Sequence, residues 1–407
     1  MLPFRSLVLA LALLAVAGCG CDHCLKSEGA AFIAPDLPGP YGVSATTMTW
    51  MDARGITLTA EVWYPIALNS DGSLPCTPKP YPEIPITGQA CRDQAPYGPL
   101  SPFPVVAFSH GNAGIRFQSI FLTESLAQHG YVVVAPDHPH DTLLDFDETQ
   151  LGTVAMRRPG DITSAVDELV MRVAGNDSGE LATSGARVDL SGIADASEFG
   201  MSGHSFGGWT TFAVAGGQID VAGLITFCTD ATNAAVGYDL CRIIGLLPEG
   251  TTNADFDPPD PRATSALSMA PAGWYSFAPG AVGTEPNGLD NVPPTLLFGG
   301  SKDDSETVAN EIQPLYDRLP VTIEGTENAL GILQNAGHYA FTDICLIGDI
   351  QPDCQEEAGG YINLDEAHSI VSELAIAWFG VYLEHDSAYQ PYLDKAAGEW
   401  ADLAYAK

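Results

Sequence analysis

Residues 199–209 constrain the chain more than any other stretch, because they contain the pentapeptide G-H-S-F-G centred on Ser205. A G-x-S-x-G sequence between a strand and a helix is typical of a sharp turn that exposes one serine hydroxyl at the end of the strand. Glycine on either side lets the strand and the helix approach each other without a Cβ clash. The alternative is a serine in an ordinary glycine-rich turn, since such pentapeptides also occur by chance. The flanks favour the sharp turn: Glu198–Ser202 predicts a short buried strand, and a helix is predicted from Trp209.

Apolar runs and amphipathic segments alternate along most of the chain. Buried strands are predicted at Phe103–Phe108, Tyr131–Ala135, Val221–Phe227, Pro294–Phe298 and Val321–Glu324. Helices are predicted at Ile120–His129, Ile162–Val173, Glu306–Arg318 and Glu366–Leu383. Strands that alternate with helices imply an α/β fold with a mostly parallel central sheet and helices on both faces.

Three other segments depart from this alternation. Ala45–Met51 and Ile56–Ile66 alternate with period two on either side of a turn at 52–55, which predicts an antiparallel hairpin. The stretch 67–102 is rich in Pro, Gly and Ser and is expected to be a long surface loop. Residues 235–290 show weak periodicity, so we expect a loop-rich insertion there that caps the site.

A serine nucleophile needs a histidine base, and the base needs an acid that orients it. His338 follows the last predicted strand on a loop, which places it near the strand tips. Asp303 follows the strand at 294–298 and is our choice for the acid, with Asp304 as its neighbour and rival. Asp230, which follows the predicted strand at 221–227, is the other alternative. For each of these aspartates, the alternative is a solvent-exposed loop residue without a role in catalysis.

An oxyanion formed at the serine needs two N–H donors about 3 Å from the developing charge. One is expected from Phe206, which follows the serine. The other is expected from Asn112, on the loop after the strand at 103–108. His110 on the same loop comes too early in the chain for the base and is expected to support the loop.

The first residues of the chain form an export signal. Arg5 precedes an apolar run of about ten residues, which is too short to prefer the role of a membrane span. The run ends in V-A-G-C at Cys19, which resembles the lipobox of bacterial lipoproteins. In those proteins the signal is removed before the cysteine and the cysteine carries a lipid. We therefore expect a signal peptide at 1–18, a tether at 19–42, a folded domain at 43–407 and a lipid anchor in a bacterial cell envelope; an ordinary secretory signal is the alternative.

Export favours disulfides. Eight cysteines remain beside Cys19, and six of them lie in three sequence-local couples. The pairs expected are Cys76–Cys91, Cys228–Cys241 and Cys345–Cys354. The remaining couple, Cys21 and Cys24, has a C-x-x-C spacing but no second pair of ligands, so a tether disulfide or free thiols are expected there.

Charge excludes one class of partner. The chain has 16 basic and 51 acidic residues and a formal net charge of −35. Because nucleic-acid binding needs clustered Lys and Arg, we expect no nucleic-acid partner. The stretch Asp137–Asp141 gathers residues of metal-ligand type, yet a polar loop beside the substrate entrance is the simpler interpretation. No metal and no cofactor are expected.

Three segments together resemble the α/β-hydrolase superfamily: S-H-G-N-A-G at 109–114, G-H-S-F-G-G at 203–208 and G-H-Y-A-F at 337–341. With V-W-Y-P at 62–65 and R-P-G-D at 158–161, they resemble the branch of platelet-activating-factor acetylhydrolases and predicted dienelactone hydrolases. The resemblance spans about residues 43–385 and implies a serine that attacks an ester. True dienelactone hydrolases carry a cysteine where this chain has Ser205. In the acetylhydrolases the acid follows the strand after the nucleophile helix, which would favour Asp230, whereas most relatives favour the position of Asp303.

The expected activity is hydrolysis of a carboxylic ester, of a short-chain or acetyl-phospholipid type, by an acyl-enzyme mechanism. The expected partners are a small-molecule or lipid ester and, through the anchor, a membrane. The alternatives are a depolymerase of polyesters or lipids, a peptidase on the same fold, and a surface lipoprotein without catalysis, since a fold does not fix a function. A closed pocket under 235–290 would favour small esters and an open cleft would favour polymers.

Overall fold

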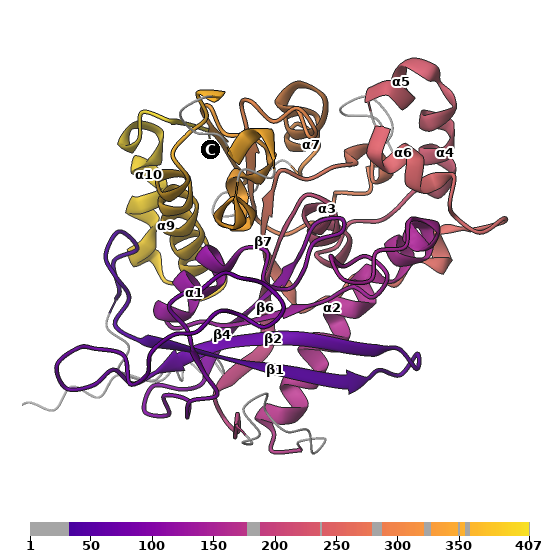
Figure 1. The fold of residues 1–407 in the computed structure, drawn as a ribbon. Coiled ribbons are helices and arrows are strands. Elements are labelled where there is room, and N and C mark those ends of the chain that lie inside the picture. The colour runs from indigo at the N-terminus through magenta and orange to yellow at the C-terminus, as the bar shows by residue number, and fades with distance from the viewer. Residues whose placement is uncertain are drawn as a thin grey trace, which may run out of the picture. The chain divides into compact units, whose positions relative to one another are not determined.

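The structure, a computed structural model of the chain, describes residues 32–176, 188–236, 238–278, 287–320, 327–348, 351–354 and 359–406. Its centre is a ten-stranded sheet with the order β10-β9-β8-β7-β6-β4-β5-β2-β1-β3. The six strands from β9 to β5 run parallel to one another, whereas β10 and β2 pair antiparallel with the two ends of this block. The predicted α/β class with a mostly parallel sheet is therefore confirmed (Figure 1).

The strands are β1 Gly42–Met51, β2 Thr57–Ile66, β3 Cys91–Arg92, β4 Phe103–Ser109, β5 Val132–Pro136, β6 Ala194–His204, β7 Ala263–Met269, β8 Thr295–Gly300, β9 Ala329–Leu333 and β10 Leu403–Ala406. The α-helices are α1 Ile120–Gln128, α2 Leu151–Val173, α3 Phe206–Val214, α4 Val221–Thr229, α5 Ala231–Val236, α6 Tyr238–Ile244, α7 Gln313–Tyr316, α9 Leu364–Tyr382 and α10 Gln390–Glu399. A π-helical turn, Val308–Ile312, leads into α7.

Successive residues of the central strands point to opposite faces, as the pleat requires. Val106 of β4 packs in one core cluster with side chains of α1 and α9, whereas Val105 packs in a second cluster with side chains of α2. The sheet thus lies between α1 and α9 on one face and α2 and α3 on the other (Figure 1). Burial on both faces explains why these strands read as continuous apolar runs.

The hairpin was predicted correctly. β1 and β2 pair antiparallel from Gly42 opposite Ile66 to Met51 opposite Thr57. The predicted helix at 120–129 is α1, and Gly130 ends it with a φ of +95°, a conformation that glycine adopts without strain. The closing helix α9 also lies where it was predicted.

Two strand predictions failed near the middle of the chain. Val221–Phe227 is not a strand but the helix α4, which begins where Asp220 accepts a hydrogen bond from the Gly223 N–H at 3.0 Å. The parallel strand beside β6 is instead β7, Ala263–Met269, inside the stretch predicted as an insertion. Its small residues gave too weak an apolar signal, although β6 and β8 bury it completely from Ser265 to Met269.

One helix boundary differs, and one predicted strand is not tested. Helix α2 begins at Leu151, eleven residues before the predicted start, and runs through Pro159, the residue type that normally ends a helix. The last parallel strand is β9, whereas the predicted strand at 321–324 lies outside the described residues.

Residues 32–41, which belong to the predicted tether, pack on the domain. The Tyr41 N–H donates to the Gln128 carbonyl at 3.4 Å, and the Leu37 carbonyl accepts from His129 at 3.0 Å. The ring of Phe32 packs edge-on against Tyr389, with ring centroids 5.0 Å apart. The predicted signal peptide and Cys19 lie outside the described residues.

The three predicted disulfides are present: Cys76–Cys91, Cys228–Cys241 and Cys345–Cys354. Such bonds fit a protein that folds in an oxidising compartment. Among the residues that the structure describes, no helix combines the length and the apolar character that a membrane span requires.

Candidate active site

The turn between β6 and α3 holds Ser205 in a strained conformation. Its φ of +59° and ψ of −121° lie in a region that residues with a Cβ rarely adopt. The glycines on either side make the turn possible: a Cβ on Gly207 would lie 1.9 Å from the Ser109 carbonyl oxygen, and one on Gly203 would lie 2.2 Å from the Gly207 carbonyl oxygen. The G-x-S-x-G spacing therefore reflects close contact between β6, α3 and the end of β4.

Two neighbouring parallel strands, β8 and β9, lead to the histidine and the acid. Asp303 follows β8 and His338 follows β9, and the His338 Nδ1 lies 2.8 Å from Asp303 Oδ2. The carboxylate also accepts the N–H groups of Ser305 and Glu306 at 2.8 Å each. Since a carboxylate only accepts, the His338 Nδ1 carries the proton and its Nε2 is left as a proton acceptor.

The surroundings of Asp303 keep it ionised. Burial alone would raise the pKa of this carboxyl, but the charge and hydrogen bond of His338 outweigh it, with help from the N–H groups of Glu306 and Ser305, so the pKa lies below its ordinary value. An ionised acid holds the histidine ring in one orientation and stabilises its imidazolium form.

Ser205 and His338 line one pocket of about 150 Å³. An apolar cavity of that size in another protein takes up a molecule as large as benzene, so the pocket has room for a small group. Gly111 and Asn112 line it from the loop after β4, residues 110–114, which was predicted to supply an oxyanion donor and is called the oxyanion loop below. Three residues of α6 also line it: Leu240, Arg242 and Ile243. Helix α6 is tied to α4 by Cys228–Cys241. Part of the predicted cap, 238–244, therefore lies over the site, although β7 belongs to the sheet.

At the pocket, the backbone N–H groups of Asn112 and Phe206 donate to no other group within the described part of the chain. Phe206 is the first residue of α3, where helical N–H groups lack intrahelical acceptors. Gly111 brings the loop against the serine, because a Cβ at this position would lie 3.2 Å from the Ser205 Cβ. Both donors predicted for an oxyanion thus lie beside the serine and remain available.

Within the described residues, Asp303 bonds His338, whereas neither of its two rivals does. Asp304, the residue after Asp303, is exposed. Asp230 is an exposed residue at the end of α4, where, among the described residues, its carboxylate accepts only the N–H groups of Thr232 and Asn233, at 2.8 and 3.2 Å. The strand that made Asp230 a candidate is a helix, so the reason for its candidacy is gone.

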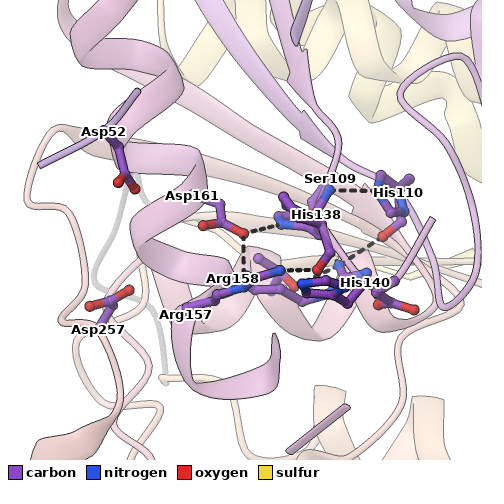
Figure 2. Close-up of polar contacts among 12 residues, drawn as sticks. Asp52, Ser109, His110, His138, His140, Arg157, Arg158, Asp161 and Asp257 are labelled. Carbon is purple, nitrogen blue, oxygen red and sulfur yellow. Dashed lines mark hydrogen bonds and ion pairs between the residues drawn. The ribbon is translucent and has the colours of Figure 1, made fainter. Parts of the chain in front are cut away.

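A second cluster of polar side chains lies behind the oxyanion loop and is drawn in Figure 2. Its members Ser109, His138, Arg158 and Asp161 are fully buried. His138 lies between Asp161 and Ser109, with Nδ1 2.9 Å from the Asp161 carboxylate and Nε2 2.9 Å from the Ser109 hydroxyl. Arg158 donates to the Ser109 hydroxyl at 3.1 Å and to the His110 carbonyl at 2.8 Å. This cluster fixes the start of the oxyanion loop from below.

The same cluster accounts for the residues of metal-ligand type at 137–141. Asp141 pairs with Arg158 at 2.6 Å and accepts the Ala113 N–H at 2.8 Å, while Asp137 pairs with Arg116. Within the described ranges, no group of three or more His, Cys, Asp or Glu side chains is arranged to hold a metal ion. The loop was predicted to line the substrate entrance; instead, His138 and Asp141 are buried beneath the oxyanion loop.

Sequence reasoning also missed Arg158, Gln118 and His204 as parts of the site. Arg158 was noted only within the R-P-G-D segment of the resemblance, and because helix α2 was predicted to begin after it, nothing indicated that its side chain is buried at the site. His204 was noted only as a variable residue of the pentapeptide, and Gln118 was not singled out. The hydrogen bonds that connect Gln118 to His204 and His204 to His338 join residues far apart in the sequence.

A scan of the chain against models of known protein families finds no match. A search among curated proteins likewise finds no relative.

Proposed function

We propose that the chain is a serine hydrolase of the α/β-hydrolase fold that cleaves carboxylic esters with a short acyl group. The observation that carries this proposal is the hydrogen-bonded His338–Asp303 pair, which opens into the same small pocket as the strained Ser205. The order serine, acid, histidine along the chain and the strand order of the sheet both agree with that fold.

In the proposed reaction the Ser205 hydroxyl gives its proton to the His338 Nε2 as its oxygen bonds to the ester carbonyl carbon. The carbonyl oxygen becomes an oxyanion and accepts the N–H groups of Phe206 and Asn112. The tetrahedral species collapses, the C–O bond to the alcohol breaks, and His338 gives the alcohol its proton. Water then repeats the sequence on the acyl-enzyme and releases the acid.

The pocket argues for small esters over polymers. Helix α6 closes one side of it, and its volume of about 150 Å³ leaves little room beyond a short acyl chain. An acetyl ester, including that of an acetyl-phospholipid, satisfies this limit on the acyl side. A lipid anchor at Cys19 in a bacterial cell envelope belongs to the same proposal and rests on the sequence of the first residues alone.

The test is hydrolysis of p-nitrophenyl esters of graded acyl length by the domain from residue 25 onward. We expect the highest kcat/KM for the shortest acyl groups and loss of nearly all activity in Ser205→Ala. Ser305→Ala is the matched control, because this serine lines the same pocket outside the proposed triad. Activity that survives in Ser205→Ala, or a preference for long chains, would contradict the proposal.

A further inference from the structure

One side chain, Gln118, connects three parts of the site. Its Oε1 accepts the N–H of Gly111 on the oxyanion loop at 2.9 Å. Its Nε2 lies 2.8 Å from Nδ1 of His204, the residue before the nucleophile. The other nitrogen of His204 lies 2.9 Å from the backbone carbonyl oxygen of His338. A continuous chain of hydrogen bonds therefore runs from the oxyanion loop to the candidate base.

The partners fix the direction of every bond in this chain. The Gly111 N–H only donates, so the amide oxygen of Gln118 faces it and the amide nitrogen faces His204. The Nδ1 of His204 must then accept, and its Nε2–H donates to the His338 carbonyl. Each polar atom in the chain has one role, and a neutral His204 fills all of them.

The surroundings of His204 agree with a neutral ring. The side chain is 2% exposed, and its ring centroid lies 4.6 Å from that of His338. Burial, together with the charge of His338, holds the pKa of His204 well below its ordinary value. A neutral His204 places no positive charge beside the imidazolium that His338 forms during the proposed reaction.

The backbone around Gln118 is fixed to the segment that follows His338. The Asp343 N–H donates to the Gln118 carbonyl at 2.8 Å, and the Ser119 hydroxyl donates to the Phe341 carbonyl at 2.9 Å. The Phe121 N–H donates in turn to the Asp343 carboxylate at 2.9 Å. Gln118 is thus anchored before its side chain reaches the loop, which is what a positioning residue requires.

We propose that Gln118, acting through His204, is a positioning residue for transition-state stabilisation: it holds the oxyanion loop, the nucleophile turn and the backbone of His338 in one register. The proposal rests on the function proposed above. With the Gly111 N–H bonded to Gln118, the next N–H, that of Asn112, is the one left for the oxyanion. Small displacements of such donors reduce rates strongly while leaving substrate binding nearly unchanged.

The experiment compares Gln118→Met with wild type. Methionine has a similar length but makes neither hydrogen bond. We expect kcat for p-nitrophenyl acetate to fall by about 10- to 100-fold with KM within about threefold, because only transition-state interactions are lost. The rate at which a fluorophosphonate probe labels Ser205 should fall by a similar factor. Gln118→Glu, which keeps the acceptor for Gly111 but cannot donate to His204, should lie between the two.

Gln128→Met is the matched control, since Gln128 lies at the end of α1 and, among the described residues, its side chain bonds only the exposed Gln89, while its backbone carbonyl accepts from Tyr41. It should react like wild type, and melting curves establish that all variants are folded. Wild-type labelling rates in Gln118→Met would overturn the positioning role, as would a rise in KM at unchanged kcat, which would make Gln118 a substrate contact. If the wild type is labelled at Ser205 yet hydrolyses no ester, the ester function alone fails, and labelling still tests Gln118. A wild type that is not labelled overturns both.

Discussion

Among the described residues, two sets of a serine, a histidine and an aspartate can be compared: in both sets the histidine bonds the aspartate, but only in the buried set does it also bond the serine. In the pocket set, His338 bonds Asp303 at 2.8 Å and faces the pocket that Ser205 lines. In the buried set, His138 bonds Asp161 at 2.9 Å and Ser109 at 2.9 Å. As a static pattern of hydrogen bonds, the buried set is the more complete of the two.

The surroundings of the two serines differ in every respect that nucleophilic catalysis requires. Ser109 is fully buried, and its oxygen also accepts from Arg158. Ser205 lies at a strained turn, lines a pocket and has two unused N–H donors beside it. Access and donors for a developing charge therefore distinguish a candidate nucleophile from a structural serine, and hydrogen-bond partners alone do not.

Replacing the two histidines gives the largest expected contrast. His338→Ala removes the proposed base and should lower kcat by about 10⁴- to 10⁶-fold with little change in stability. His138→Ala leaves Ser109 and Asp161 without their buried partner and should cost about 2–4 kcal/mol of unfolding free energy, while kcat of the folded fraction stays within about tenfold. Ester hydrolysis and urea unfolding of both variants measure this contrast. If folded His138→Ala is as inactive as His338→Ala, the proposed division between a catalytic and a structural histidine is wrong.

The next largest effect is expected on the free energy of unfolding. It comes from the buried ion pair between Asp141 and Arg158, which lies beside the buried set beneath the oxyanion loop. Asp141→Ala leaves the Arg158 guanidinium buried without its counter-charge and also frees the Ala113 N–H. Breaking such a pair should lower the free energy of unfolding by about 3–5 kcal/mol.

Asp167→Ala is the control, because it breaks the exposed pair between Asp167 and Arg262 and should cost less than about 1 kcal/mol. Denaturant titrations at neutral pH compare the two. Equal losses would mean that the buried cluster contributes no more to stability than a surface contact.

Features that are encoded by residues close together in the sequence could be predicted, and features that depend on contacts across the fold could not. Ser205, Asp303 and His338 follow strands directly, so a pattern read along the chain placed them at one edge of the sheet. The disulfides were predicted because each pair is close in sequence. The three residues of the buried set stood in segments that were noted, but their contacts join 109, 138 and 161 across the fold, so no local pattern showed that these residues bond one another.

The failed elements have physical causes of the same kind. Val221–Thr229 is an apolar stretch too short to distinguish strand from helix by periodicity, and only Asp220 at its start signalled a helix. Strand β7 is built of small residues and is specified by its neighbours β6 and β8. Tertiary context, which a single sequence does not display, decided both.

The two aspartates should also differ in how pH affects stability. Burial raises the pKa of Asp161 to about 6 despite the nearby Arg157 and Arg54, whereas that of Asp303 is lowered. Between the unfolded value near 4 and 6, the folded state holds a proton on Asp161 that the unfolded state has lost, so the stability that this group contributes falls as pH rises through that window. Asp303 is ionised in both states there and contributes a constant amount.

The measurement is the unfolding free energy of wild type minus that of each Asn variant, at pH 4.5 and at pH 6.5. For Asp161→Asn this difference should fall by about 2 kcal/mol as pH rises, and for Asp303→Asn it should change by less than about 0.5 kcal/mol. Parallel changes in the two variants would show that the aspartates share one electrostatic environment.

The smallest effects are expected from aspartates that belong to neither set. Asp230 bonds only the N–H groups that follow it, and Asp304 is exposed, so neither carboxylate can orient an imidazole at the pocket. Asp230→Asn and Asp304→Asn should change kcat/KM by less than about twofold, against a loss of about 10⁴-fold for Asp303→Asn, which also disturbs the tautomer of His338. Any change in Asp304→Asn should vanish at high salt, because an exposed charge acts on the site only through a screened field. A large, salt-independent loss in either variant would assign the acid to that residue and separate His338 from Asp303, its partner in the structure.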